Sequence, residues 1–160
     1  MDRDRLNALL DGFARGDLER DELVEMLARL PFQALGDARV DTHRTLRNGF
    51  PEVVLADGKT VEQIARIVRV LRDAGGDVLV TRVSAEQARA LIAAVPGLEH
   101  LAAGRLLALR QTPLVPRGRG VIAVVSAGTS DLAVAEEAAL VAEHFGNKVE
   151  RVYDAGVAGL

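Results

Sequence analysis

Residues 121–153, VIAVVSAGTSDLAVAEEAALVAEHFGNKVERVY, decide the fold of this chain. The five apolar residues 121–125 predict a buried strand. The alanine-rich segment 132–145 predicts a helix that ends at Gly146-Asn147, and residues 149–153 predict a second strand. A strand, a helix and a strand with short connections form a parallel βαβ unit. The sequence therefore predicts an α/β protein.

The same alternation is present before this unit. Short apolar runs predict strands at 53–55, 78–81 and 106–109, although the third is also compatible with a helix. Two helices are predicted between them, because Thr60 with Gln63 and Ser84 with Gln87 have the spacing of a capping box. Residues 36–50, which precede these elements, have a less regular pattern and are interpreted as a short helix or a loop.

The N-terminal residues 2–30 predict a helical hairpin with Asp17 as the N-cap of its second helix. Without a partner such a hairpin is unstable, so it must pack on something or dimerise. Residues 111–120 contain two prolines and two glycines without periodicity, which is typical of a linker.

The composition excludes several classes of function. The chain has 160 residues with 20 Lys and Arg against 23 Asp and Glu, and a net charge of -3 does not suit general nucleic-acid binding. Cysteine is absent, and His43, His100 and His144 are scattered, so neither a thiolate site nor a zinc site is expected. No apolar run approaches the length of a membrane span. We therefore expect a cytoplasmic protein without nucleic-acid or membrane partners.

The loop from Ser126 to Asp131 is the first candidate site. It follows a predicted parallel strand and precedes a helix, where open sheets bind ligands and where unpaired N–H groups attract phosphate or carboxylate. Gly128 allows close approach, the hydroxyl groups add donors, and Asp131 could cap the helix or transfer a proton. An ordinary N-cap with turn residues explains the same pattern equally well. The candidate residues are Ser126, Gly128, Thr129, Ser130 and Asp131.

Two further candidates are weaker. The loop 156–159 follows the second strand and is expected beside the first loop, where the two would form a nucleotide-sized crevice; an ordinary turn is the alternative. An arginine-rich group is a candidate for binding phosphate or carboxylate, since guanidinium groups match such ligands. A solvated surface explains it better from composition alone. The group consists of Arg39, Arg44, Arg47, Glu52 and Lys59.

The N-terminal and C-terminal parts of the sequence both resemble the LarB family of nickel-pincer cofactor biosynthesis. The resemblance rests on the segment 121–138, on Val152 to Leu160 (VYDAGVAGL), on 41–60 with its Gly49-Phe50-Pro51-Glu52 motif, and on 80–82. It implies a small N-terminal α/β domain at 1–112, a linker at 113–120, and at 121–160 the first βαβ of a PurE-like, flavodoxin-like parallel sheet.

The resemblance implies an enzyme that carboxylates the pyridinium ring of nicotinic acid adenine dinucleotide with carbon dioxide. The same enzyme hydrolyses the phosphoanhydride and releases AMP. It implies assistance by Mg²⁺, covalent catalysis by a cysteine thiolate, and a homo-oligomer. Asp131 and Ser126 would then be catalytic. The implied substrate-binding residues are Gly128, Thr129, Ser130, Gly156, Val157, Ala158, Gly159, Arg44, Arg47, Glu52, Lys59 and Arg82.

The chain departs from the family at one decisive point, because it has no cysteine. We therefore expect it to be a truncated form, inactive alone, with an incomplete catalytic domain. The alternatives are a non-catalytic module that binds a nucleotide or a partner, and an AIR carboxylase of purine biosynthesis. The latter is disfavoured because Tyr153-Asp154-Ala155-Gly156 replaces the Ser-Ala-His-Arg usual in PurE proteins.

Overall fold

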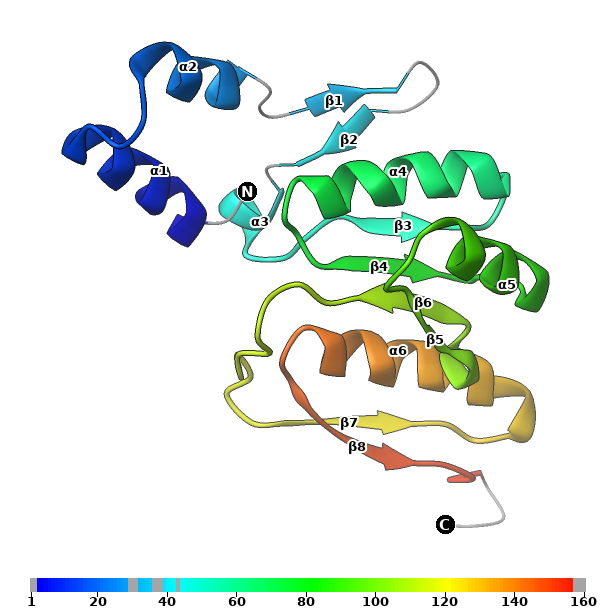
Figure 1. Cartoon of the computed structure of the whole chain (residues 1–160). Helices are drawn as coiled ribbons and strands as arrows, with labels where there is room; N and C mark the ends of the chain where they lie inside the picture. The colour runs from blue at the N-terminus through cyan, green and yellow to red at the C-terminus, as the bar shows by residue number, and fades with distance from the viewer. Residues whose placement is uncertain (1–2, 29–31, 36–38, 43, 157–160) are drawn as a thin grey trace.

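A computed structural model describes residues 3–28, 32–35, 39–42 and 44–156. They form three sheets with helices between and beside them (Figure 1). The helices are α1 (Arg3–Arg15), α2 (Arg20–Ala28), α3 (Arg44–Asn48), α4 (Val61–Asp73), α5 (Ala85–Ala94) and α6 (Leu132–His144), with short 3-10 turns η1 (Ala102–Gly104) and η2 (Thr129–Asp131). The strands are β1 (Phe32–Ala34), β2 (Arg39–Asp41), β3 (Val53–Leu55), β4 (Val78–Thr81), β5 (Glu99–Leu101), β6 (Leu106–Leu109), β7 (Val121–Val125) and β8 (Lys148–Val152).

The central sheet has the strand order β3-β4-β6-β5. Strands β3 and β4 are parallel, whereas β6 is antiparallel to both of its neighbours. The predicted capping boxes are present at both crossover helices: Thr60 caps α4 and Ser84 caps α5. Residues 106–109 are a strand, and β5 beside them was not predicted. The α/β fold class predicted from the sequence is confirmed.

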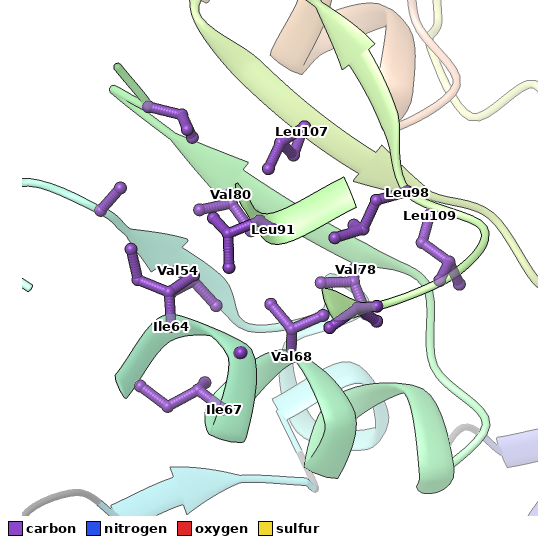
Figure 2. Packing of buried hydrophobic residues seen from close by; sticks show 14 of the residues in the cluster. Val54, Ile64, Ile67, Val68, Val78, Val80, Leu91, Leu98, Leu107 and Leu109 are labelled. Carbon is purple, nitrogen blue, oxygen red and sulfur yellow. The ribbon is translucent and has the colours of Figure 1, made fainter. Parts of the chain in front are cut away.

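One face of the central sheet carries the main core. Helices α4 and α5 cover this face, and their apolar side chains interlock with those of the strands (Figure 2). Ile64 and Val68 of α4 and Leu91 of α5 are fully buried against β4, where Val78 and Val80 are also fully buried. This is the packing that the helical spacing of the apolar residues predicts.

Helix α6 covers the opposite face of the same sheet. Its Leu140 and Val141 pack on Leu79 and Leu106, and Gly104 in η1 approaches the helix backbone closely. The other side of α6 lies on β7 and β8, so this helix is shared between two sheets (Figure 1). The 111–120 linker therefore leads into a unit that is packed against the first one.

The parallel pair β7–β8 is open on its outer face. The pairing confirms the predicted parallel βαβ unit. The prediction that 121–125 is a buried strand was wrong: Val121 is 50% exposed and Val125 62% exposed, because α6 covers one face and no described segment covers the other. Parallel strands are normally covered on both faces.

The N-terminal hairpin of α1 and α2 lies away from these layers (Figure 1). Asp17 is not the N-cap of α2, which begins at Arg20; instead its carboxylate accepts a hydrogen bond from Arg15 at 2.9 Å. Residues 36–50 were predicted as a helix or loop, but they contain strand β2, paired with β1, as well as helix α3. None of the described helices is both long and apolar enough to cross a membrane.

Candidate functional site

The carboxyl ends of β3, β4, β7 and β8 lie on one side of the molecule, at the right in Figure 1. The loops that follow these strands form an edge that we call the carboxyl rim. It consists of 56–60, 81–84, 126–131 and 153–156 in the described residues. An ion pair between Arg82 and Glu137, 3.5 Å apart, joins the end of β4 to the first half of α6. This ion pair ties a loop of the central sheet to the helix that lies between the two sheets.

Ser126 lies at the centre of the β7–β8 half of this rim. Its backbone N–H donates to the Val152 carbonyl at 3.0 Å, and its own carbonyl accepts from Ala155 N–H at 3.0 Å. These bonds place Ala155, after β8, beside the loop after β7, with Gly156 against the carbonyl of Ala127. The rest of the predicted loop 156–159 lies outside the described residues.

The Ser126 hydroxyl is an unusual feature of the rim. The residue is only 8% exposed, and its Oγ has no hydrogen-bond partner among the described residues. Leaving a buried hydroxyl unpaired costs roughly 1–3 kcal/mol. Such a group is expected where a ligand or water supplies the missing partner.

Asp131 closes the turn before α6. Its carboxylate accepts from Gly128 N–H at 3.4 Å and from Ser130 Oγ at 3.3 Å. Both contacts are long for hydrogen bonds, so the Gly128 amide is available to a better acceptor. Thr129, Ser130 and Asp131 are exposed, and a helix of 13 residues starts immediately after them. The turn thus offers donors beside a helix N-terminus, where anions are favoured.

Backbone strain is concentrated at the same edge. Among the described non-glycine residues, Arg82, Arg105 and Asp154 have positive φ values of 57°, 52° and 60°. Arg82 follows β4 and Asp154 follows β8, so both lie in the rim, and Arg105 lies beside it because its carbonyl accepts from Val83 N–H at 2.8 Å. A left-handed non-glycine residue costs of order 1 kcal/mol, and such residues gather at functional sites. The sequence carries no signal for this strain.

The predicted residues at the β3–β4 half of the rim are only partly available. Lys59 follows β3 at the rim, and its Nζ donates to the Leu55 carbonyl at 2.9 Å. Its own carbonyl accepts from Gln87 at 3.1 Å. Arg82 is exposed and points its Nε to Glu137. Both cations are therefore tethered near the rim.

The arginine-rich group predicted at 39–59 does not form one site. Arg44 and Arg47 belong to α3, which precedes β3, whereas Lys59 follows β3 at its other end (Figure 1). Arg39 lies on β2, and Glu52 accepts a hydrogen bond from the backbone N–H of Asp41. The cluster was inferred from closeness in sequence, but the length of β3 separates its members. His43, Val157, Ala158 and Gly159 lie outside the described residues.

A network of side chains braces β8 against α6. Arg151 forms a two-bonded pair with Glu143, at 2.6 and 2.9 Å, and lies 3.3 Å from Glu136. Tyr153 donates to Glu136 at 2.7 Å. The Arg151 hydrogen bonds lower the pKa of Glu143, and desolvation with the neighbouring Glu136 raises the pKa of Tyr153. Sequence reasoning missed this network, which fixes the strand that carries the second rim loop.

A cavity of about 510 Å³ lies at the opposite edge of the sheet, far from the rim. Three arginines line it, and each donates to a carbonyl at a helix C-terminus: Arg5 to Ala74 at 2.7 Å, Arg110 to His144 at 2.9 Å, and Arg117 to Gly49 at 2.6 Å. Helix C-termini carry partial negative charge, so these cations are already balanced. Two lining aspartates further offset the positive charge of the three arginines.

His144 is buried beside that cavity. Its Nδ1 lies 3.1 Å from the Arg110 guanidinium, which can only donate, so Nδ1 is the acceptor and Nε2 carries the proton. Asp77 in turn pairs with Arg110 at 3.2 Å. Burial and the charge of Arg110 lower the pKa of His144, against a smaller opposing effect of Asp77. This cluster holds the end of α6 to the central sheet.

The metal expected from the family resemblance finds no ligand set in this part of the protein. Among the described residues no three Asp, Glu, His or Cys side chains form a group that could hold a metal ion. The rim carboxylates Asp57, Asp131 and Asp154 come from three separate loops.

The described residues define an α/β protein in which a mixed four-stranded sheet is followed by a parallel βαβ unit. Residues 32–111 match the protein family described as "LarB/PurE-like N-terminal domain". The chain belongs to this LarB/PurE-like family.

One curated relative is the uncharacterized protein MJ0165 of Methanocaldococcus jannaschii. It is 27% identical over 161 residues, which is 97% of this chain. The chain spans 63% of the length of that relative.

Proposed function

We propose that the carboxyl rim is part of the nucleotide site of an enzyme of nickel-pincer cofactor biosynthesis. The substrate is nicotinic acid adenine dinucleotide, whose pyridinium ring takes up carbon dioxide and whose phosphoanhydride is hydrolysed to release AMP. The observation that carries the proposal is the buried Ser126 hydroxyl without a partner among the described residues, beside the N-terminus of α6. Family membership supports it independently.

The rim residues have distinct parts in this proposal. Ser126 Oγ and the Gly128 amide donate to a phosphate or to the ring carboxylate, and the exposed hydroxyls of Thr129 and Ser130 complete the contact. Lys59 and Arg82 supply positive charge from the adjoining strand ends, which favours approach of the dinucleotide.

Asp131 is the rim carboxylate best placed to accept a proton. When carbon dioxide forms a bond to a ring carbon, that carbon gives up its hydrogen as a proton, and a carboxylate can receive it. The thiolate that the family resemblance implies is not supplied by this chain, which has no cysteine. We therefore expect the chain to bind substrate without turning it over.

Calorimetry with the dinucleotide tests this proposal. We expect weak but measurable binding. Ser126→Ala and Asp131→Asn should each lower the affinity about tenfold, which corresponds to one lost polar contact of about 1.4 kcal/mol. Asp73→Asn is the matched control, because Asp73 is exposed at the C-terminal end of α4, outside the carboxyl rim. An absence of binding heat, or equal effects of Asp131→Asn and Asp73→Asn, would contradict the proposal.

A second assay separates substrate binding from catalysis. Incorporation of labelled carbon dioxide into the dinucleotide should not occur with these 160 residues alone. Turnover by the chain would refute the predicted need for a cysteine. Binding to another protein without any heat from the dinucleotide would favour the alternative of a non-catalytic module.

A further inference from the structure

The hairpin of α1 and α2 has more apolar surface than it buries. Leu10 and Phe13 of α1 are 46% and 42% exposed, and Val24 and Met26 of α2 are 54% and 39% exposed. Among the described residues of the two helices, only Gly12 and Leu23 are buried. Helices of 13 and 9 residues are too short to be stable in water without packing.

The attachment of the hairpin to the rest of the protein is narrow. The two helices contact mainly one another, and they lie apart from the layered body (Figure 1). Arg5 supplies a polar anchor by donating to the Ala74 carbonyl at 2.7 Å. Exposed hydrogen bonds of this kind contribute only about 1 kcal/mol each, whereas about twenty residues must be ordered. Another surface must therefore cover the hairpin.

The charges of the two helices identify that surface as a second hairpin of the same kind. Helix α1 has three arginines against two aspartates, a net charge of +1, and α2 has one arginine against three carboxylates, a net charge of -2. A two-fold axis places α1 of one copy against α2 of its partner twice, so that both contacts join opposite charges. A hairpin that is basic on one helix and acidic on the other is thus complementary to itself.

We infer that the α1–α2 hairpin is a dimerisation surface, on which two copies of this chain pack α1 against α2 around a two-fold axis. Leu10, Phe13, Val24 and Met26 form the apolar contact, and the opposite charges set the pairing. The surface lies outside the matched residues 32–111 and does not depend on the rim. A homo-oligomer built on the catalytic domain would use different residues.

Sedimentation of the 160-residue chain over a concentration series tests the inference. We expect a monomer–dimer equilibrium, and Phe13→Glu should raise the dimer dissociation constant at least about tenfold, since each dimer loses two apolar contacts. Val125→Glu is the matched control: Val125 is also exposed but lies on β7, far from the hairpin. Circular dichroism of each variant establishes that the fold is retained.

A charge exchange gives the sharpest result. The double variant Arg3→Glu/Arg15→Glu makes α1 acidic, and the double variant Asp21→Lys/Glu25→Lys makes α2 basic. Each variant alone should be monomeric, because both of its helices then have net charges of the same sign. An equimolar mixture should form heterodimers, because opposite net charges then face each other in both contacts.

Three results would overturn the inference. They are a wild-type chain that stays monomeric at its highest soluble concentration, a dimer weakened by Val125→Glu but not by Phe13→Glu, and variants that fail to recombine on mixing.

Discussion

The central sheet and the β7–β8 pair are built from similar residues but are packed very differently. In β4, all four residues are buried, whereas in β7 only Val124 is even partly buried. Both strands are rich in valine, and both run parallel to a neighbour. The difference lies in their covering, because helices lie on both faces of β4 but, among the described elements, only α6 lies against β7.

This comparison shows where stability and chemistry reside in the chain. The well-covered sheet holds nearly all of the buried apolar side chains. The open pair carries the loops 126–131 and 153–156, which have the unpaired hydroxyl and one of the strained residues. Helix α6 packs on both the central sheet and the β7–β8 pair. The position of the loops on the open pair therefore depends on how α6 packs on the well-covered sheet.

The largest difference is expected between matched valines of the two strands. Val80→Ala should cost about 2–3 kcal/mol in the free energy of unfolding, because Val80 is fully buried and leaves a cavity. Val125→Ala should change it by less than about 0.5 kcal/mol, since that side chain is 62% exposed. Urea unfolding of both variants measures the contrast, and equal losses would mean that β7 is covered in solution.

The contact between the regions is tested at Gly104. A Cβ atom there would lie 3.0 Å from backbone atoms of Glu136 and Glu137 in α6. Because the helix backbone cannot yield as a side chain would, Gly104→Ala should destabilise the protein by about 1–2 kcal/mol. Gly120→Ala is the control, since a Cβ atom at that position would have no neighbour within 4 Å. Thermal unfolding of the two variants should differ, and similar curves would argue against the docking of α6.

The pH dependence of stability should report on the far end of α6. The pKa of His144 is lowered in the folded protein, so the unfolded chain binds more protons around and below its ordinary pKa. Stability should therefore rise with pH through the interval between the folded and unfolded pKa values, and fall as the solution becomes more acidic. His144→Gln should flatten this slope. A slope that His144→Gln leaves unchanged would contradict this assignment.

A small or favourable change in stability is expected at Ser126. Ser126→Ala removes an unpaired buried hydroxyl, so the free energy of unfolding should stay the same or rise by about 0.5–1 kcal/mol. Ser84→Ala removes the capping hydroxyl of α5 and should instead cost about 1 kcal/mol. Chemical unfolding of both variants distinguishes a functional hydroxyl from a structural one; a clear loss of stability in Ser126→Ala would indicate a structural role.

Local patterns predicted most of the central fold. The capping boxes at Thr60 and Ser84, and the apolar spacing in α4, depend on neighbouring residues alone, so they could be found in the sequence. Exposure of β7 could not be predicted, because a strand of five apolar residues looks the same whether its second face is covered or not. The pairing of β1 with β2 was missed for a similar reason: short strands carry little periodicity.

The candidate site was predicted in part. Adjacency of the loops at Ser126 and Ala155 followed from the parallel arrangement of their strands. Positive φ at Arg82 and Asp154 could not be predicted, because it arises from tertiary constraints on residues that normally avoid it. The supposed arginine cluster failed because sequence proximity was taken for proximity in space across β3.

Mapping amide chemical shifts during titration with nicotinic acid adenine dinucleotide tests the central claim most directly. The account predicts that the shifts change at 126–131 and 153–156, with smaller changes near Lys59 and Arg82. Amides around Gly75 to Asp77, which line the cavity at the other edge, should stay unchanged. Changes confined to that cavity, or none at any concentration, would show that the carboxyl rim is not the nucleotide site.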